Sequence, residues 1–136
     1  YRAEDWAAKV VEAYNYWRAD MVIAEVNNGG DLVETVLRTT PGGRLLPYEG
    51  VHATRNKFTR AEPVAALMEQ GLDHHVGELV KLEEEMTTWE GKKGEDSPNR
   101  IDAKVWGAFA LLPEMGGYRP QMGGNFVGAM RMTGFG

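Results

Sequence analysis

The sequence contains no cysteine, which excludes disulfide bonds, zinc sites built on thiolates and a cysteine nucleophile. It has no apolar run long enough to cross a bilayer, and its first residues lack the basic-then-apolar layout of a signal peptide. Neither a P-loop nor a GxGxxG motif occurs, which excludes nucleotide sites of those two types. A cytosolic protein without a membrane partner is therefore expected.

Basic residues are also scarce, since the net charge is −5 over 136 residues. A DNA-binding protein usually carries a basic surface, so the overall charge counts mildly against DNA as a partner. Only the field near the site matters, however, and a site for divalent cations is itself acidic. Positive charge gathers locally at Arg55, Lys57 and Arg60.

Hydrophobic periodicity and turn residues predict helices that alternate with short strands. Such alternation indicates an α/β fold with some parallel strands. The glycine- and methionine-rich segment 113–136 lacks periodicity and is expected to be a tail, flexible or ordered only by a partner, behind a domain at 1–112. Helices are expected at 3–18, 32–39, 62–70, around 79–89 and at 98–112, and strands at 21–26, within 44–53 and at 72–77.

Local patterns add finer expectations for these helices. Trp6 and Trp17 fall on one apolar face of the first helix and are expected in the core. Pro63 is expected in the first turn of its helix. Ser97 is expected to cap the last helix, and the acidic run 83–85 is expected to face solvent for the most part.

Glu25 stands near the end of the apolar run MVIAEV, just before a glycine-rich turn. A charged carboxylate on a buried strand is costly unless it is paired or binds a metal. Open α/β sheets place ligands at the carboxyl ends of their strands. The pattern leaves two interpretations open, a metal ligand or an acid that reaches solvent or pairs with an arginine.

Asp102 is the second unusual acid. With Val105, Trp106 and Phe109 it follows the i, i+3, i+4, i+7 spacing of one helix face, so its carboxylate is expected on an inward stripe. An interaction with the helix dipole is the alternative, worth about 0.3–1 kcal/mol, but it does not explain an inward position.

Glu25 and Asp102 together suggest a divalent cation, because hard cations such as Mg²⁺ take oxygen ligands. Two such ions can activate a water and stabilise the leaving oxygen in phosphodiester cleavage, although two carboxylates are normally too few for two ions. Asp31 is better explained as a helix cap, with a role as a metal ligand left open by its place near Glu25. His74 and His75, adjacent on an expected strand, point to opposite faces and cannot form one metal face.

Three segments resemble a known family, in its order and with similar spacing. They are AEVNNGGDLVETVLR at 24–38, RNKFTRAEPVAALMEQGLDHHVG at 55–77, and LVKLEEEMTTWEGKKGEDSPNRIDAKVWGAFAL at 79–111, which contains an SPxRxDAxVW motif. In these segments the chain resembles the C-terminal nuclease domain of the terminase large subunit of tailed phages.

The resemblance implies an RNase H-like mixed sheet flanked by helices and a DNA endonuclease that uses two Mg²⁺ or Mn²⁺ ions. It assigns Glu25 and Asp102 as catalytic acids and metal ligands. It also assigns Arg55, Lys57 and Arg60 as contacts to DNA phosphates. For these three basic residues, a position on the solvated surface without a DNA role is an equally good interpretation. It further implies double-stranded DNA, a terminase ATPase domain and the portal as partners, in the cytoplasm of a bacterial host.

One departure from the family concerns the start of the sequence. The family's first catalytic aspartate lies on strands that precede the helix at 3–18, so a fold without its first strands, inactive in isolation, is expected. An exposed sheet edge would then favour a homo-oligomer. Two alternatives stay open: a catalytically incomplete prophage or mobile-element fragment that binds DNA or protein, and a related RNase H-like resolvase.

Overall fold

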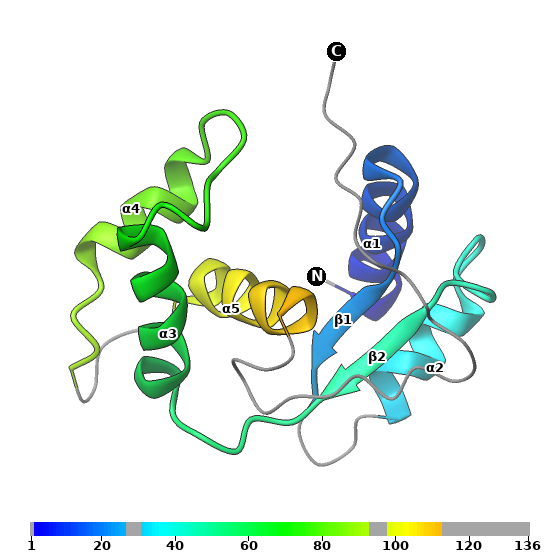
Figure 1. Cartoon of the computed structure of the whole chain (residues 1–136). Helices are drawn as coiled ribbons and strands as arrows, with labels where there is room; N and C mark the ends of the chain where they lie inside the picture. The colour runs from blue at the N-terminus through cyan, green and yellow to red at the C-terminus, as the bar shows by residue number, and fades with distance from the viewer. Residues whose placement is uncertain (1, 27–30, 93–97, 113–136) are drawn as a thin grey trace.

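The computed structural model describes residues 2–26, 31–92 and 98–112 (Figure 1). The expected segment 113–136, the turn at 27–30 and the expected cap at Ser97 lie outside these residues. No helix within the described ranges is long and apolar enough to span a membrane. In chain order the elements are α1 (Ala3–Trp17), β1 (Val22–Glu25), α2 (Asp31–Thr39), β2 (Tyr48–Val51), α3 (Lys57–Glu69), α4 (Val80–Thr88) and α5 (Asn99–Leu111).

The two strands form a small parallel sheet, as the alternation of helices and strands predicts. Val22 lies opposite Tyr48 and Glu25 opposite Val51. Parallel strands need a crossover, and α2 provides it between β1 and β2. Glu25 is the last residue of β1, so the register brings it to the carboxyl edge of the sheet.

One hydrophobic cluster joins α1, α2 and the sheet. Its buried members are Ala7, Val11, Leu37 and Leu46. Ala7 and Val11 are four residues apart and therefore share a face of α1. In Figure 1, α1 and α2 lie together beside the strands. This cluster anchors β1 and thereby the backbone of Glu25.

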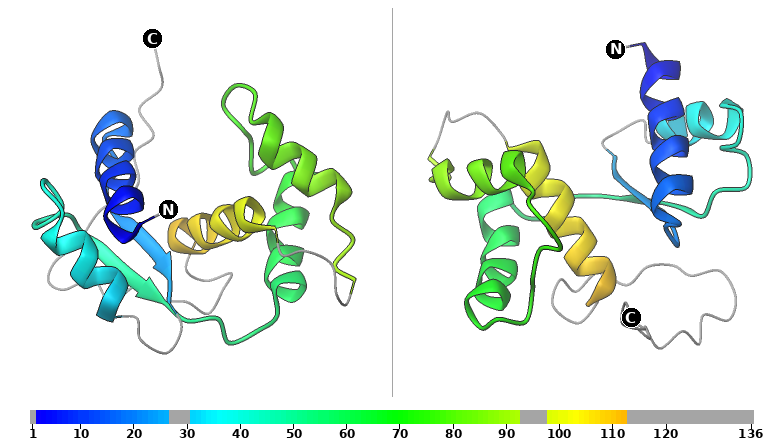
Figure 2. Two further views of the ribbon diagram at one scale, coloured as in Figure 1. Left: turned by 180° about the vertical axis from the view of Figure 1, so that it is seen from behind. Right: turned by 90° about the horizontal axis from the view of Figure 1, so that it is seen from above.

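A second cluster joins α3, α4 and α5 to the sheet. The buried residues of α5 are Ile101, Val105, Trp106 and Phe109, and Ile23 of β1 packs against this cluster. Figure 2 shows α5 lying between the sheet and the pair α3 and α4 in both views. The inward stripe predicted for α5 is therefore confirmed, and it places this helix against the strand that carries Glu25.

The prediction of a strand at 72–77 is wrong, because these residues form a loop between α3 and α4. Val76 is 92% exposed and Leu72 is 69% exposed, so this short run has no core to face. The start of α3 is also corrected, from residue 62 to Lys57, which moves Pro63 from a first turn into the helix interior. Pro63 removes one backbone donor there, and packing has to offset a cost of about 3 kcal/mol.

The expected burial of Trp17 is wrong as well. Its side chain is 76% exposed and stacks edge-to-face with the exposed Tyr16, whereas Trp6 packs against the first cluster. Within the part of the chain that the structure describes, the cluster follows α1 as far as Tyr14 and does not include its last turn. The helical periodicity gives the direction of a side chain but does not give the extent of the neighbouring elements.

Candidate functional site

The carboxyl end of β1 positions Glu25 against α5. The indole Nε1 of Trp106 donates a hydrogen bond of 2.8 Å to Glu25 Oε2. The same oxygen lies 3.5 Å from Arg60 Nη2. The Glu25 side chain is 26% exposed, so one side of the carboxylate still reaches solvent.

The first turn of α5 positions Asp102 beside the same arginine. Arg60 Nη2 donates to Asp102 Oδ1 at 2.6 Å, and Lys57 Nζ lies 2.8 Å from Asp102 Oδ2. Both carboxylate oxygens therefore have a cationic partner. Asp102 and Trp106 are one helical turn apart, which explains why one face of α5 reaches both Glu25 and Arg60.

The start of α3 determines where the two cations lie. The Asn56 side chain accepts a hydrogen bond of 2.9 Å from the Thr59 backbone N–H and so caps the helix. The helix therefore begins at Lys57, and Lys57 and Arg60, three residues apart, share the face that meets α5. Asn56, a residue type that is favoured at the N-cap, is the signal in the sequence that could have placed this start correctly.

Arg60 is the single buried charged residue among those described, with an exposed fraction of 4%. A buried charge is tolerated only when it is paired, and Glu25 and Asp102 supply the pairs. Its guanidinium carbon also lies 4.9 Å from the centre of the Trp106 ring, a cation–π contact. Its Nε and Nη1 atoms are buried without a hydrogen-bond partner in the described structure, so the guanidinium is only partly satisfied.

A pocket of about 550 Å³ opens onto this group. Both acids line it, and its other lining residues are Met21, Ile23, Lys57, Asn99, Ala103, Trp106 and Gly107. The pocket therefore contains two carboxylates, one half-exposed ammonium group and an aromatic wall. It is large enough to admit a small polar group such as a phosphate.

The structure brings together four of the five residues singled out in the sequence. Glu25, Asp102, Lys57 and Arg60 form one cluster, hereafter the acid–base cluster. Arg55 lies outside it and is exposed, one residue before the cap of α3. The burial of Arg60 contradicts the solvated surface position that was an alternative for this residue.

The remaining candidates lie elsewhere. His75 lies in the loop before α4, and its Nδ1 is 3.1 Å from Oε1 of Glu83 in that helix. His74 is exposed. The hydrogen bond from His75 and one from the Leu79 N–H lower the pKa of Glu83. The side chain of Asp31 lies outside the described part of the structure. Within that part, no group of three or more His, Cys, Asp or Glu residues could hold a metal ion.

Glu85 holds the end of α5 that carries Asp102. Its carboxylate accepts hydrogen bonds from the backbone N–H groups of Arg100 at 2.9 Å and Ile101 at 3.2 Å, and it pairs with the Arg100 guanidinium at 2.5 Å. Desolvation raises the pKa of Glu85, but the hydrogen bonds from Arg100 and Ile101 outweigh it, so the pKa lies below its ordinary value. The sequence pattern predicted that Glu85, with the rest of the run 83–85, mostly faces solvent. In the structure Glu85 instead caps α5 from a neighbouring helix.

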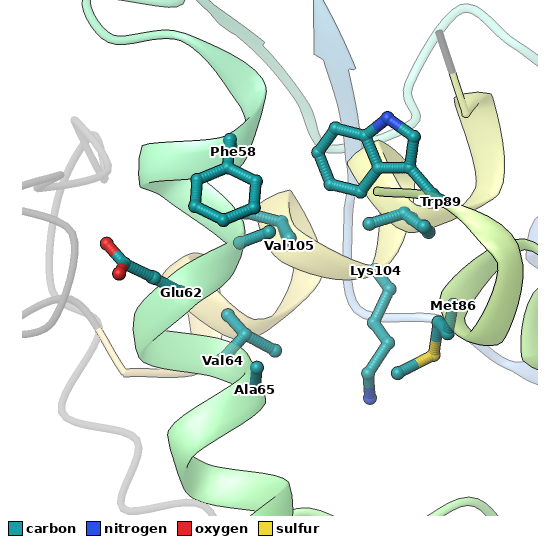
Figure 3. A pocket seen from close by; sticks show the side chains of 10 residues that line it. Phe58, Glu62, Val64, Ala65, Met86, Trp89, Lys104 and Val105 are labelled. Atoms are coloured by element: carbon teal, nitrogen blue, oxygen red, sulfur yellow. The ribbon is translucent and has the colours of Figure 1, made fainter. Parts of the chain in front are cut away.

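A second, mostly apolar pocket lies between α3, α4 and α5 (Figure 3). Phe58, Trp89 and Val105 line its volume of about 200 Å³. Lys104, also in its lining, is paired with Asp73 at 2.7 Å. The pocket lacks a pair of convergent acids, so the acid–base cluster is the better candidate for chemistry.

A comparison with protein families connects this geometry to a known group. A family model for the terminase RNaseH-like domain matches residues 2–111, which is most of the chain. Comparisons with curated proteins and with solved structures give no match. The parallel sheet flanked by helices agrees with an RNase H-like fold that has fewer strands. The chain therefore belongs to the family of terminase RNaseH-like domains.

Proposed function

We propose that this terminase nuclease module contributes Glu25 and Asp102 to a divalent-cation site that hydrolyses DNA phosphodiester bonds. The observation that carries the proposal is the convergence of the two acids, since oxygens of both carboxylates lie within 3.5 Å of one nitrogen of Arg60. The two residues are far apart in the sequence and belong to different elements. A fold brings such acids together at a cost in desolvation, which favours a functional reason.

The residues present fit part of such a metal site. Carboxylate oxygens are the ligands that Mg²⁺ and Mn²⁺ prefer. Arg60 Nη2 already occupies a point where both carboxylates favour positive charge. Two carboxylates are too few for two ions, so we propose that a further aspartate from a preceding segment completes the site, as the family resemblance implies.

Four residues of the pocket then have defined roles. Glu25 and Asp102 would hold the cation, which supplies activation of a water molecule and neutralisation of phosphate charge. Trp106 orients Glu25 through its indole N–H. Lys57 is 32% exposed at the pocket and can turn toward a phosphate.

We propose double-stranded DNA as the substrate, with contacts from the chain mainly to its backbone. Arg55 is exposed and Lys57 is half-exposed at the start of α3, where both can reach phosphates. Contacts to phosphates carry little sequence information, so cleavage without strong sequence preference is expected. The terminase ATPase domain and the portal remain proposed partners on the basis of the family. Pairing of chains through an edge of the two-stranded sheet that the described residues form is also proposed.

The test is plasmid cleavage by the chain joined to the upstream strands of a terminase nuclease domain, with Mg²⁺ or Mn²⁺. Asp102→Asn and Glu25→Gln are each expected to lower the cleavage rate by at least about 100-fold, because each removes a charged ligand. Asp73→Asn is the matched control, since Asp73 pairs with Lys104 away from the pocket. Equal cleavage by Asp102→Asn and the parent would refute the assignment.

A second candidate function is a catalytically incomplete module that binds DNA or protein. It is favoured by the absence of a group of three metal-binding side chains within the described ranges. It is also favoured by the ion pairs that already engage both acids, Asp102 with Lys57 and Arg60, and Glu25 with Arg60. Calorimetry with Mn²⁺ discriminates the two functions, because the second one predicts no saturable binding that depends on Asp102.

A further inference from the structure

We propose that Arg60 and Lys57 are resident counter-cations, which hold Glu25 and Asp102 together in the metal-free chain and compete with a divalent cation for them. The inference rests on the proposed function, since it concerns the same two acids. It gives Arg60 a role different from a DNA contact. It also predicts how the affinity for metal ions is set by residues that are not ligands.

The charges of the cluster balance without any added ion. Two carboxylates, Glu25 and Asp102, face one guanidinium and one ammonium group. A divalent cation that joined this set would leave two excess positive charges in a partly buried place. Because charges interact strongly where water is largely excluded, the cation has to displace Arg60, Lys57 or both from the carboxylates.

The position of Arg60 matches that of a substitute cation. A single nitrogen, Nη2, contacts oxygens of both acids, at 2.6 Å for Asp102 and 3.5 Å for Glu25. A guanidinium that served only as a structural bridge would be expected to use its fork of donors on the carboxylates. Instead, Nε and Nη1 are buried without a partner in the part of the chain that the structure describes.

Buried donors without acceptors are uncommon and call for a reason. Here the reason is that the guanidinium is held by charge rather than by a full set of hydrogen bonds. Trp106 contributes by placing its ring against the Arg60 guanidinium while its N–H binds Glu25. Arg60 can therefore leave the carboxylates without breaking other hydrogen bonds of its side chain.

Lys57 and Arg60 differ in how easily a metal ion displaces them from the carboxylates. Lys57 is 32% exposed and, among the described residues, forms its ion pair with Asp102 alone, so it can turn into solvent. Arg60 is 4% exposed and contacts both acids, so it is the stronger competitor. Removal of Arg60 should therefore increase metal affinity more than removal of Lys57.

The experiment is calorimetric titration of Mn²⁺ into the parent chain and into the Arg60→Met and Lys57→Met variants. Methionine keeps an unbranched apolar side chain and removes the charge. We expect Mn²⁺ to bind Arg60→Met at least about tenfold more tightly than the parent, and Lys57→Met to lie between them. Arg44→Met is the matched control, because Arg44 is exposed and lies outside the acid–base cluster, and its affinity should equal that of the parent.

Stability provides a second readout if Arg60→Met folds poorly. Without metal, Arg60→Met leaves the negative charges of Glu25 and Asp102 without their shared guanidinium partner. The variant should therefore melt at a lower temperature than the parent. Mn²⁺ should then raise its melting temperature more than that of the parent, because a ligand that binds the folded state stabilises it. A purely structural salt bridge would give a loss of stability that Mn²⁺ does not restore.

The outcomes separate this inference from the proposed function. Equal Mn²⁺ affinities for the parent and Arg60→Met, both abolished by Asp102→Asn, would overturn the inference and leave the function standing. If no variant, Arg60→Met included, binds Mn²⁺ in a way that depends on Asp102, the inference is overturned, and the proposed function is then decided by the cleavage assay with the upstream strands. Tighter binding by Arg60→Met that is lost in the double variant with Asp102→Asn supports both.

Discussion

Trp106 connects the two carboxylates at the scale of single residues. Its indole N–H binds Glu25, its ring lies on Arg60, and Asp102 is one turn away on the same helix. A charged acceptor strengthens a hydrogen bond to about 1.5–3 kcal/mol. The orientation of Glu25 therefore depends on a tryptophan that the sequence pattern identifies only as core.

We predict that Trp106→Phe lowers the free energy of unfolding by about 1–3 kcal/mol, because Glu25 loses its donor while much of the aromatic packing remains. Urea unfolding measures the change. The loss should be smaller in a Glu25→Gln background, since the charged partner is then already absent. Equal losses in both backgrounds would show that the effect is packing alone.

At the residue scale the sequence predicts the acids better than their partners. Glu25 and Asp102 are conspicuous because each is an acid in an apolar pattern. Arg60 is not, since it lies in a basic stretch that is compatible with an exposed surface. Its burial follows from the packing of α3 on α5, which no local pattern specifies.

At the scale of elements, the start of α5 depends on a carboxylate from α4. Pro98 precedes the helix and provides no side-chain cap. Glu85 accepts hydrogen bonds from the first backbone N–H groups instead. This contact fixes the turn that carries Asp102, so α4 supports the site without contacting it.

We predict that Glu85→Gln lowers the melting temperature at pH 7 and that the difference from the parent shrinks in acid. The pKa of Glu85 is lower in the folded state than its ordinary value of 4.5. Its contribution to stability is therefore fully present above that value and is lost as the pH falls through the folded-state pKa. Thermal unfolding of both proteins from pH 7 to pH 2 measures the difference.

Glu84→Gln is the matched control for this pH series, because Glu84 is exposed on the same helix. Its melting temperature should follow that of the parent at each pH. A difference between Glu85→Gln and the parent that stays constant down to pH 2 would contradict the charge-dependent cap.

The elements themselves were largely predictable, because helical periodicity and turn residues act locally. All five helices and two of the three expected strands are present. The strand expected at 72–77 does not form, because a short apolar run becomes a strand only beside another strand, and the described residues place none there. The early start of α3 was missed because the Asn56 cap lies inside a basic stretch that resembles a loop.

At the scale of the whole molecule, two hydrophobic clusters both include residues of the sheet. The first anchors β1 through α1 and α2, and the second anchors α5 through α3 and α4. Ile23 packs in the second cluster from β1, so the two parts are joined next to Glu25. The acid–base cluster lies at this junction, with its acids supplied by β1 and α5 and its cations by α3.

The family resemblance predicted this meeting of distant acids, whereas periodicity alone could not. Secondary-structure patterns give the face of each helix but not which helix packs on which strand. Neither kind of prediction gives the pairing of Asp102 with Lys57 and Arg60 and of Glu25 with Arg60, because this pairing depends on side-chain geometry across three elements.

The most direct test of the central claim uses the indole N–H signals of the four tryptophans during titration with paramagnetic Mn²⁺. If Glu25 and Asp102 form one cation site, the Trp106 signal should broaden at the lowest Mn²⁺ concentration, and earlier still in Arg60→Met, because Trp106 Nε1 contacts Glu25. Asp102→Asn should remove this selectivity. Broadening of the exposed Trp17 before Trp106, or broadening of Trp106 that persists unchanged in Asp102→Asn, would contradict a metal site at this position.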